Sequence, residues 1–375
     1  MGDKILDFLN KLVSIDSHYP EEKNLCMHLN HLLEDHGFIQ KQRVENNRFN
    51  LVVEKGKGKK SVLLYSHLDT IGVANGWKTK PFKLTVVGNK AYGLGSWDMK
   101  GGMAVNILNF LNFQPKNFTL KIAFCVDEEN ISKGGYRLIN SNFMKGVECV
   151  VSPEPAFYYK NRGIVIARPG RAVYVIKIKG LPLHYALYHP ALDINLFLSD
   201  FLNELKRLNK FSNKKNGFIF ARRIESKTTG MSTPHEISLE LDSSILPPKT
   251  NKQLLEEIKN LAKIIKRKYG NYFSVNVSFL KRDTPFLNSY EISKNNKYLK
   301  MLKQSVSEKI GKKALPYFRT SISDENIFGV HGITVLGIGP NGGNAHAPNE
   351  WVSLSSLEKL YIIINDFLNK VDNQV

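Results

Sequence analysis

Two polar side chains follow an apolar run in the first fifth of the chain. The stretch SVLLYSHLDT (61–70) places His67 and Asp69 directly after the apolar residues 62–64. Side chains two positions apart in an extended segment share a face, so this pair has a common partner. One alternative is that His67 and Asp69 form only a surface hydrogen bond with each other. The other is that His67 binds a metal ion while Asp69 holds or tunes the site from behind. The pair alone leaves both alternatives open.

A second candidate lies in the glycine-rich stretch AYGLGSWDMKGGMA, which contains Asp98 before a helical pattern. Gly93 and Gly95 begin a dinucleotide-binding fingerprint, but Asp98 occupies the place of the third glycine, so we discard that interpretation. A solvated loop aspartate is the other alternative, and it fits poorly with the apolar neighbours Trp97 and Met99. We expect the glycines to let the backbone turn around a buried carboxylate.

Two adjacent glutamates follow the apolar run LKIAFCV. Glu128 and Glu129 stand at the end of a predicted strand, and we expect their side chains to project to opposite sides. Carboxylates with different directions can have different roles, one as a metal ligand and one as a free base. The competing interpretation is an ordinary charged turn, DEEN, which the pair alone does not exclude.

Two further candidates follow apolar runs. Glu154 comes after VECVVS and lies between Pro153 and Pro155, which restrict the backbone and indicate a positioned ligand. His346 lies in the loop NGGNAHAPNEW, after the run ITVLGIGP.

The candidate ligands combine two imidazoles with three carboxylates. They are His67, Asp98, Glu129, Glu154 and His346. Mixed nitrogen and oxygen ligands without a thiolate suit zinc, cobalt or manganese. Two ions about 3.5–4 Å apart need one bridging carboxylate and terminal ligands on each side. Five ligands with one bridge match that requirement. We therefore expect two divalent ions, and zinc is the metal we expect before cobalt or manganese.

The elements that must position these residues follow a regular pattern. Residues 1 to about 40 have the three-to-four spacing of helices. Continuous apolar strands then alternate with helical patterns such as MAVNILNFLNF, which is typical of a sheet covered on both faces. All four polar clusters after apolar runs lie beyond the carboxyl ends of strands, where open α/β sheets hold their functional residues.

The middle of the chain has a different pattern. Alternating runs (RAVYVIKIKG, HEISLELDSS and YFSVNVSFLKR) are separated by two helical patterns. This order predicts an inserted α+β domain over 165–282. Residues 1–164 and 283–375 then form one catalytic, metal-binding domain.

The charge of the chain raises the question of a nucleic-acid partner. The 375 residues include 53 Lys and Arg against 34 Asp and Glu, for a net charge of +19. The lysines are scattered and no nucleic-acid-binding motif accompanies them, so we do not expect nucleic acid as the main partner. A positive field that draws in anionic substrates is the more modest interpretation.

Location is inferred from what the sequence lacks. No apolar run reaches the roughly 18 residues of a membrane helix, and the first residues have no signal-peptide core, so we expect a cytoplasmic protein without membrane contact. Cys26, Cys125 and Cys149 lie in apolar contexts without paired spacing, and we expect buried free thiols.

Five motifs together resemble the M20 family of metallopeptidases. HLDT, GSWDMKGG, DEE, PEP and AHAPNEW follow one another in that family's order and spacing, across nearly the whole chain. The family includes acetylornithine deacetylase, succinyl-diaminopimelate desuccinylase, aminoacylase and glutamate carboxypeptidase. The resemblance implies a zinc-exopeptidase-like, three-layer α/β catalytic domain with a mostly parallel mixed sheet. It also implies an inserted lid or dimerisation domain, and hence a homodimer.

The resemblance also implies a role for each metal ligand. Asp98 would bridge the two ions, and His67 and Glu154 would be terminal ligands of different ions. Glu129 and His346 would complete the two sites.

Three catalytic roles come from the same resemblance. Asp69 would orient His67, and Glu128 would be the general base. The segment GLPLHYA (180–186) is similar to the family's Gly-x-x-x-His segment, so His184 would donate a hydrogen bond to the substrate carbonyl, often from the neighbouring subunit. An ordinary surface histidine is the alternative for His184.

The chain departs from the family pattern at positions that touch substrate or lid packing. Leu94 replaces a common arginine, and 231–234 (MSTP) replaces an Asn-x-x-Pro stretch without the arginine that usually follows. These departures leave the substrate open.

We therefore expect a metal-dependent amidohydrolase that cleaves the amide bond of an N-acyl amino acid. The alternative within the same chemistry is a dipeptidase or carboxypeptidase that acts on short peptides. From other classes, the alternatives are a non-catalytic metal-bound scaffold and a nucleic-acid-binding protein.

Overall fold

The computed structural model describes residues 2–209 and 217–374, in two compact units. The first unit comprises 1–167, 292–319 and 323–375, and the second comprises 168–291 and 320–322. The insert expected from the sequence begins at 165 and ends at 282. Each unit is described by itself below.

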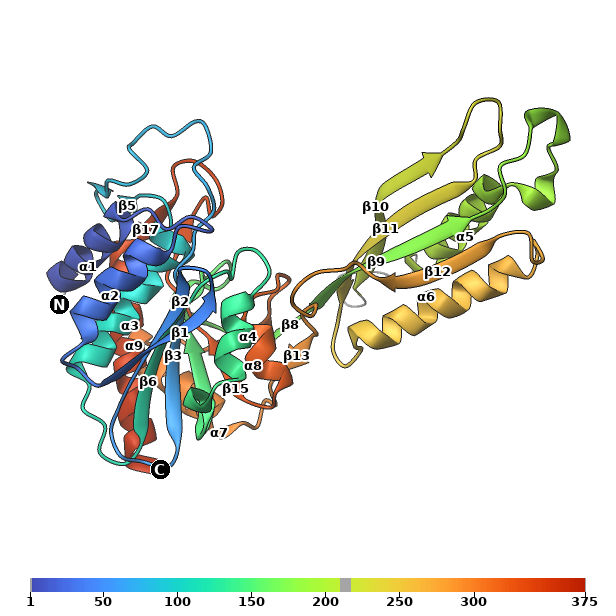
Figure 1. Cartoon of the computed structure of the whole chain (residues 1–375). Helices are drawn as coiled ribbons and strands as arrows, with labels where there is room; N and C mark the ends of the chain where they lie inside the picture. Colours follow the sequence, from blue (N-terminus) through green and yellow to red (C-terminus); the bar gives the residue numbers. More distant parts are fainter. Residues whose placement is uncertain (1, 210–216, 375) are drawn as a thin grey trace. The chain divides into compact units, whose positions relative to one another are not determined.

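The first unit contains a mixed, mostly parallel sheet with the strand order β1-β2-β6-β3-β7-β15-β8 (Figure 1). Its strands are β1 (Phe38–Glu45), β2 (Arg48–Lys55), β3 (Ser61–His67), β6 (Thr119–Cys125), β7 (Val147–Ser152), β8 (Gly163–Arg168) and β15 (Thr334–Gly337), with β14 (Leu315–Phe318) beside β8. β3 runs parallel to both β6 and β7, and β15 runs parallel to β7. The predicted α/β class is confirmed.

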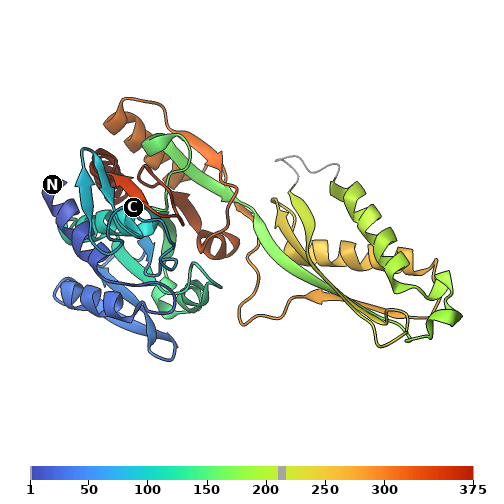
Figure 2. The same cartoon turned by 90° about the horizontal axis from the view of Figure 1, so that it is seen from above.

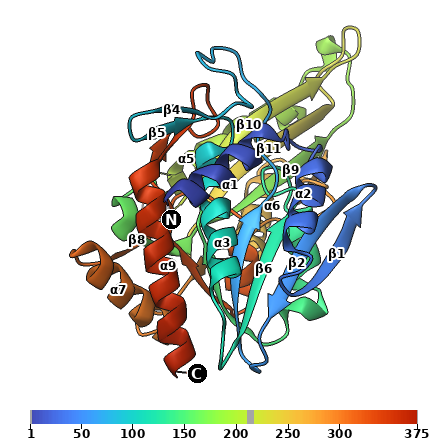
Figure 3. The same ribbon diagram turned by 90° about the vertical axis from the view of Figure 1, so that its left-hand side faces the viewer.

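Helices cover both faces of this sheet. They are α1 (Gly2–Ser14), α2 (Lys23–Leu33), α3 (Gly101–Asn112), α4 (Lys133–Ile139), α7 (Lys297–Ile310), α8 (Glu325–Val330) and α9 (Leu354–Gln374). Figures 1 and 3 show α2, α3 and α9 on one face, and α4 and α8 on the other. α3 is buried from Gly101 to Phe110, because it packs between the sheet and the helices α1 and α9. Its apolar sequence therefore has no polar stripe.

A small antiparallel sheet accompanies the large one in the first unit. Its order is β16-β17-β5-β4, with β16 (Gly342–Gly343), β17 (Trp351–Ser353), β5 (Lys90–Tyr92) and β4 (Thr85–Val87). Trp351 pairs with Tyr92, which joins two segments far apart in the sequence. This pairing matters for function, because the loop of His346 connects β16 to β17 and the loop of Asp98 follows β5.

The second unit is an antiparallel sheet with two helices on one face (Figure 2). The strand order is β10-β11-β9-β12, with β9 (Gly170–Lys179), β10 (Phe218–Lys227), β11 (Glu236–Ile245) and β12 (Ser274–Phe279). The helices are α5 (Ile194–Asn209) and α6 (Asn251–Lys266), and the two-residue β13 (Tyr290–Glu291) ends the insert. The α+β pattern of the insert is therefore present, with β10 as an additional strand that its charged sequence concealed.

Two expectations from composition can be compared with the structure. All three cysteines are buried and free, as predicted. Among the described residues, no helix has both the length and the apolar character needed to cross a bilayer.

Candidate metal centre

The candidate residues gather where four neighbouring strands end. β6, β3, β7 and β15 lie side by side in that order and run parallel. Glu128 and Glu129 follow β6, His67 ends β3, Glu154 follows β7 and the loop of His346 follows β15. The predicted arrangement beyond the carboxyl ends of the strands is present.

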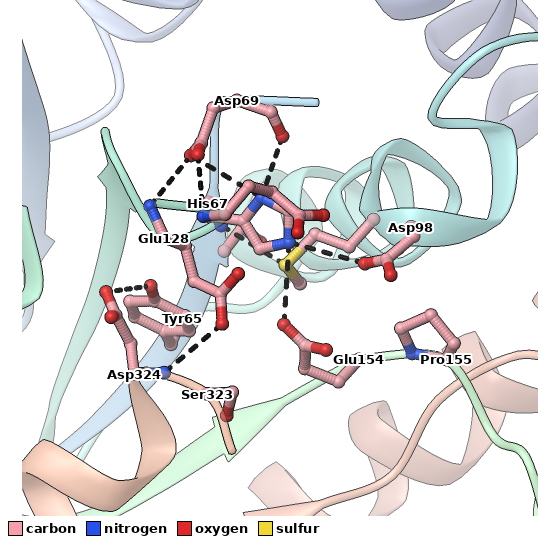
Figure 4. Close-up of polar contacts among 12 residues, drawn as sticks. Tyr65, His67, Asp69, Asp98, Glu128, Glu154, Pro155, Ser323 and Asp324 are labelled. Carbon is pink, nitrogen blue, oxygen red and sulfur yellow. Dashed lines mark hydrogen bonds and ion pairs between the residues drawn. The ribbon is translucent and has the colours of Figure 1, made fainter. Parts of the chain in front are cut away.

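His67 is held at the end of a fully buried strand. Its Nδ1 donates a hydrogen bond to the backbone carbonyl of Asp69 at 2.9 Å, while the Asp69 carboxylate lies 3.7 Å away. Its Nε2 lies 3.4 Å from Asp98 Oδ1 and 3.5 Å from Glu154 Oε1. Figure 4 shows these three side chains pointing toward one another. The tautomer that donates from Nδ1 leaves Nε2 as an electron-pair donor toward the carboxylates.

Asp69 is bound mainly to the glutamate turn. Its two carboxylate oxygens accept hydrogen bonds from the backbone N–H of Glu128 at 3.1 Å and of Glu129 at 2.8 Å. The side chain is fully buried, and burial raises the pKa of Asp69 to about 7. Asp69 therefore positions both the ring of His67, through its backbone, and the glutamate turn, through its carboxylate.

Asp98 lies in a kinked segment, Ser96–Lys100, before α3. A buried carboxylate, Glu350, fixes the backbone there: it accepts hydrogen bonds from the N–H groups of Gly95 (2.7 Å), Trp97 (2.9 Å) and Asp98 (2.8 Å). Glu350 is only 2% exposed. It stands in the motif AHAPNEW, in which only the histidine was predicted to have a role in the site.

Replacing Glu350 by Ala is expected to lower the free energy of unfolding by about 3 kcal/mol or more. The reason is that three buried backbone N–H groups lose their acceptor, and each such loss costs about 1–3 kcal/mol. Urea denaturation of the purified variant measures this change. Glu21→Ala, at an exposed position, serves as the matched control. An unchanged midpoint for Glu350→Ala would show that water replaces the carboxylate without cost.

Glu154 is placed by two close approaches of the backbone. A Cβ atom on Gly102 would collide with the carbonyl oxygen of Pro153, and one on Gly339 would collide with that of Glu154. Only glycine permits these contacts. Arg319 supports the same segment: its Nη1 donates to Pro155 O at 2.9 Å, and its Nη2 lies 3.8 Å from Glu154 Oε2.

The two adjacent glutamates lie beyond β6, which ends at Cys125, and they form part of a turn. The expectation that they project to opposite sides, which rested on strand alternation, is therefore wrong. An oxygen of each carboxylate lies within 4.8 Å of the other's and of a His67 nitrogen. The two carboxylates still have different partners. Glu128 Oε1 accepts from Asp324 N at 3.3 Å, and Glu129 Oε1 accepts from His346 Nε2 at 2.8 Å.

A buried pair lies behind Glu128. The hydroxyl of Tyr65 donates to Asp324 Oδ2 at 2.6 Å, and Figure 4 shows both groups beside the Glu128 carboxylate. Burial, together with Glu154, raises the pKa of Glu128 well above its usual value. A carboxylate with a raised pKa is a stronger base than one in water.

The candidate ligands form two groups that share one carboxylate. His67, Asp98 and Glu154 make one group, and Asp98, Glu129 and His346 make the other, each with ligand atoms within 4.8 Å of one another. Asp98 Oδ1 faces His67, and Asp98 Oδ2 lies 3.4 Å from His346 Nε2. The shared position of Asp98 suits a bridge. The assignment of His67 and Glu154 to different ions is not supported, because both lie in one group.

The site fits a divalent ion by two observations. Within the described residues, His67 Nε2 and Asp98 Oδ1 are buried and have no hydrogen-bond partner. Buried polar atoms are ordinarily satisfied, so such a pair indicates a ligand between them. The donors are nitrogen and carboxylate oxygen without thiolate, which suits zinc, cobalt or manganese.

The carboxylates around the two candidate histidines shift the pKa values of His67 and His346. Hydrogen bonds and charges from Asp98 and Glu129 raise the pKa of His346 to about 11. Burial disfavours the charged form of His67, but Asp98, Glu128, Asp69 and Glu154 outweigh it and raise its pKa well above the usual value. The clustered carboxylates therefore favour positive charge at this site, which divalent cations would supply.

His184 belongs to the second unit. It is exposed, its Nδ1 accepts a hydrogen bond from Ala186 N at 3.3 Å, and its ring packs against Tyr185. His184 also forms an isolated β-bridge with Ser232. The segments 180–186 and 231–234, which were compared with the family pattern above, therefore lie side by side.

Comparison with known proteins agrees with this geometry. A sequence profile of peptidase family M20/M25/M40 matches residues 63–370. The succinyl-diaminopimelate desuccinylase of Rickettsia rickettsii is 25% identical over 394 aligned positions, 98% of this chain and 99% of that protein. A probable succinyl-diaminopimelate desuccinylase of Staphylococcus epidermidis is 27% identical over 215 residues, 55% of this chain. The chain spans about half the length of this relative and of similar staphylococcal proteins.

Solved structures share the fold over their full length. A tripeptidase from Staphylococcus aureus has a TM-score of 0.81 at 18% identity, and the match covers 100% of this chain and 99% of that one. A dinuclear metal-binding peptidase of the M20 family from Bacillus subtilis has a TM-score of 0.77 at 13% identity, with the same coverage. The sequence match and the shared fold confirm the resemblance carried by the five motifs, and the chain belongs to peptidase family M20/M25/M40.

Proposed function

We propose that this protein is a metal-dependent amidohydrolase that cleaves the amide bond of an N-acyl amino acid, as a desuccinylase or deacetylase does. The observation that carries the proposal is the pair of ligand groups that share Asp98, with the carboxylate of Glu128 beside them. Polarisation of the scissile carbonyl and activation of a water molecule are the chemistry that divalent ions supply at such a site.

The remaining chemistry falls to the chain's own residues. Glu128 accepts the proton of the attacking water and passes it to the leaving amine, while the Asp324 N–H holds Glu128 Oε1. One ion, most simply zinc, would be held by His67, Asp98 and Glu154. A second ion would be held by Asp98, Glu129 and His346. Cobalt or manganese suits the same donors.

The proposed substrate class rests on the relatives. The match to the desuccinylase of Rickettsia rickettsii covers 98% of this chain, and the name of that enzyme gives an N-succinyl amino acid as its substrate. The alternative is a dipeptidase or carboxypeptidase on short peptides, because the same ions and base cleave a peptide bond. The tripeptidase from Staphylococcus aureus has this fold.

A substrate panel tests the proposal. N-succinyl-diaminopimelate, N-acetylornithine and a set of dipeptides and tripeptides are offered to the enzyme with added zinc, cobalt or manganese. We expect hydrolysis of an N-acyl amino acid. Hydrolysis of peptides alone would support the alternative, and no turnover by fully metal-loaded protein would favour a non-catalytic scaffold. A steep salt dependence of RNA binding in gel shifts would favour nucleic-acid binding instead.

Removal of metal by EDTA is expected to abolish activity, and two equivalents of metal are expected to restore it. The reason is that two ligand groups with a shared carboxylate describe a two-ion site. Elemental analysis during readdition measures the stoichiometry. Full activity with one tightly bound ion would contradict the bridging role of Asp98.

We also propose that the first unit is the catalytic domain and that two copies of the chain pair through the insert to form a homodimer. We further propose that the protein is located in the cytoplasm. The exposed apolar side chains of the edge strand β10 support the dimer: Phe218, Phe220 and Ile224 are 54%, 48% and 49% exposed. An apolar edge strand is a ready surface for pairing with another copy. Three buried free thiols support a reducing compartment.

Replacing His184 by Ala is expected to lower turnover about 10²–10³-fold, the usual loss for one donor to a developing oxyanion. Metal content should not change, because His184 is not a candidate ligand. Turnover and elemental analysis of the same preparation measure both quantities. His189→Ala, a second exposed histidine in the same segment, is the matched control.

A mixing experiment tests whether His184 acts across the dimer. Inactive His184→Ala and inactive Glu128→Gln subunits are combined, and verified heterodimers are assayed. Each mixed dimer would contain one complete site, so activity should return. Heterodimers without activity would show that His184 acts within its own chain.

A further inference from the structure

Four cationic side chains surround a cavity of about 730 Å³ in the first unit. The cavity lies where the short helix Lys160–Arg162 packs against α7 and α9. Its cations are Lys160, Arg162, Lys312 and Lys359, and the rest of its lining is Tyr159, Asn161, Ile310 and Asn341. Cavities of roughly 300–1,000 Å³ are typical of small-molecule sites.

The lining of this cationic cavity contains no carboxylate. None of its four cations forms an ion pair with an acid among the described residues. Like charges gathered around one space repel one another, and a bound anion relieves that repulsion. The four cations come from three separate segments of the chain, so their convergence is a product of the fold. The charge indicates a ligand with more than one negative group.

A second cavity of about 690 Å³ adjoins the first and shares Tyr159, Lys160 and Asn341 with it. Aromatic side chains dominate this aromatic cavity. Phe157, Tyr158 and Tyr159 are 47%, 51% and 49% exposed, and Trp351 completes the set. Three consecutive half-exposed aromatic residues form an apolar patch that suits a planar ring.

The junction of the two cavities has two further features. Tyr159 (φ 61°) and Lys160 (φ 51°) both have left-handed backbone conformations, which non-glycine residues seldom adopt and which concentrate at ligand-binding positions. The Oδ1 atom of Asn341 is buried and has no hydrogen-bond partner among the described residues. It can accept a hydrogen bond from a ligand hydroxyl or N–H group.

We propose that these joined cavities bind a small phosphorylated anion of the nucleotide class. The phosphates lie among Lys160, Arg162, Lys312 and Lys359, and the planar base packs against Tyr158 and Tyr159. A nucleic-acid chain fits less well, because the cations surround one cavity rather than follow a stripe along the surface. The lining of both cavities contains no candidate metal ligand, so the site is separate from the proposed catalytic centre.

Isothermal titration of the metal-loaded protein with ADP tests the proposal. Removing one charge-assisted contact to phosphate weakens binding about 10-fold or more. The double variant Lys312→Gln/Lys359→Gln should therefore bind ADP about 100-fold more weakly. The control Lys57→Gln/Lys300→Gln removes the same net charge at exposed positions outside the cavity and should bind as the parent does. Lys312→Arg should retain binding.

Two further ligands test the aromatic part and the ligand class. Fructose 1,6-bisphosphate carries two phosphates without a planar base, so it should bind more weakly than ADP. Its affinity should be the same for Tyr159→Leu as for the parent protein. Equal affinity for both ligands would overturn the assignment of the aromatic cavity. Single-stranded RNA that binds more tightly than ADP, and loses affinity in the lysine double variant, would overturn the small-molecule assignment.

Three outcomes would overturn the whole proposal. The first is the absence of any heat of binding at millimolar ADP. The second is an equal loss of affinity in the double variant and its control, which would mean that only the net charge matters.

The third outcome concerns the metal. ADP is titrated again after EDTA treatment, and ADP held by the cavities should still bind when the metal is gone. Binding that disappears with the metal would assign the ADP to the metal centre and overturn the proposal.

Discussion

Replacing Glu128 by Gln is expected to lower turnover about 10⁴-fold or more while both metal ions stay bound. General acid–base catalysis contributes about 10²–10⁴-fold, and here one residue both accepts and donates the proton. Gln keeps the shape of the side chain, and its amide oxygen can still accept the hydrogen bond from Asp324 N. The loss therefore reports the missing proton acceptor rather than a change in packing.

Glu129→Gln is the matched comparison, because the two residues are adjacent and chemically alike. Glu129 accepts a hydrogen bond from His346 within the group that also contains Asp98, so its loss should weaken metal binding. A neutral amide is a poor replacement for an anionic oxygen ligand. Metal content after gel filtration, measured by mass spectrometry, should separate the two variants.

The outcomes that contradict these roles are clear. If Glu128→Gln loses metal and Glu129→Gln keeps it, the roles of base and ligand are reversed. If both variants keep metal and activity, the DEE segment is only a charged turn, as the sequence alone allowed.

Much of the site was predictable because strand ends are local features. The apolar runs before His67, Glu128 and Glu154 are strands, and their parallel pairing brings the polar residues that follow to one edge of the sheet. Burial on both faces makes such strands continuous in hydrophobicity, which a sequence shows directly. His346 follows the same rule at β15, although a longer loop intervenes.

The parts that were missed depend on long-range contacts or on irregular backbone. Glu350 holds the Asp98 segment across 252 residues, and Tyr65 reaches Asp324 across 259 residues, so no local pattern marks either pair. The predicted directions of the Glu128 and Glu129 side chains were wrong, because side chains alternate between faces only within a strand. Strand β6 ends before these two residues. The grouping of His67 with Glu154 depends on the neighbouring positions of β3 and β7 in the sheet.

Strand β10 was missed for a different physical reason. Most of its side chains are exposed, and its sequence FIFARRIESK carries charges on both faces. An edge strand pairs with one neighbouring strand only, and much of its surface stays in contact with solvent. Its sequence therefore lacks the run of apolar residues that marks an inner strand such as β9. The same exposure is what makes β10 a candidate surface for the dimer.

Replacing Asp98 by Asn is expected to remove both metal ions and to reduce turnover to background. Asp98 is the one carboxylate that both three-residue ligand groups share among the described residues, with Oδ1 toward His67 and Oδ2 toward His346. Asn offers a single oxygen, and its NH₂ group is a donor that cannot bind a cation. Affinity for each ion should fall by more than about 100-fold, above the loss typical of residues that only support a ligand.

The comparison variant Glu154→Gln changes only one of the two groups, so it should lose one ion and retain the other. The Asp98→Asn variant keeps the backbone N–H that donates to Glu350, so the segment around this position should stay folded. Circular dichroism confirms the fold, and elemental analysis gives the metal content of each variant. If Asp98→Asn loses one ion only, Asp98 belongs to a single group and the two ions have no shared carboxylate. If Glu154→Gln loses both ions, the two sites are coupled through a residue other than Asp98.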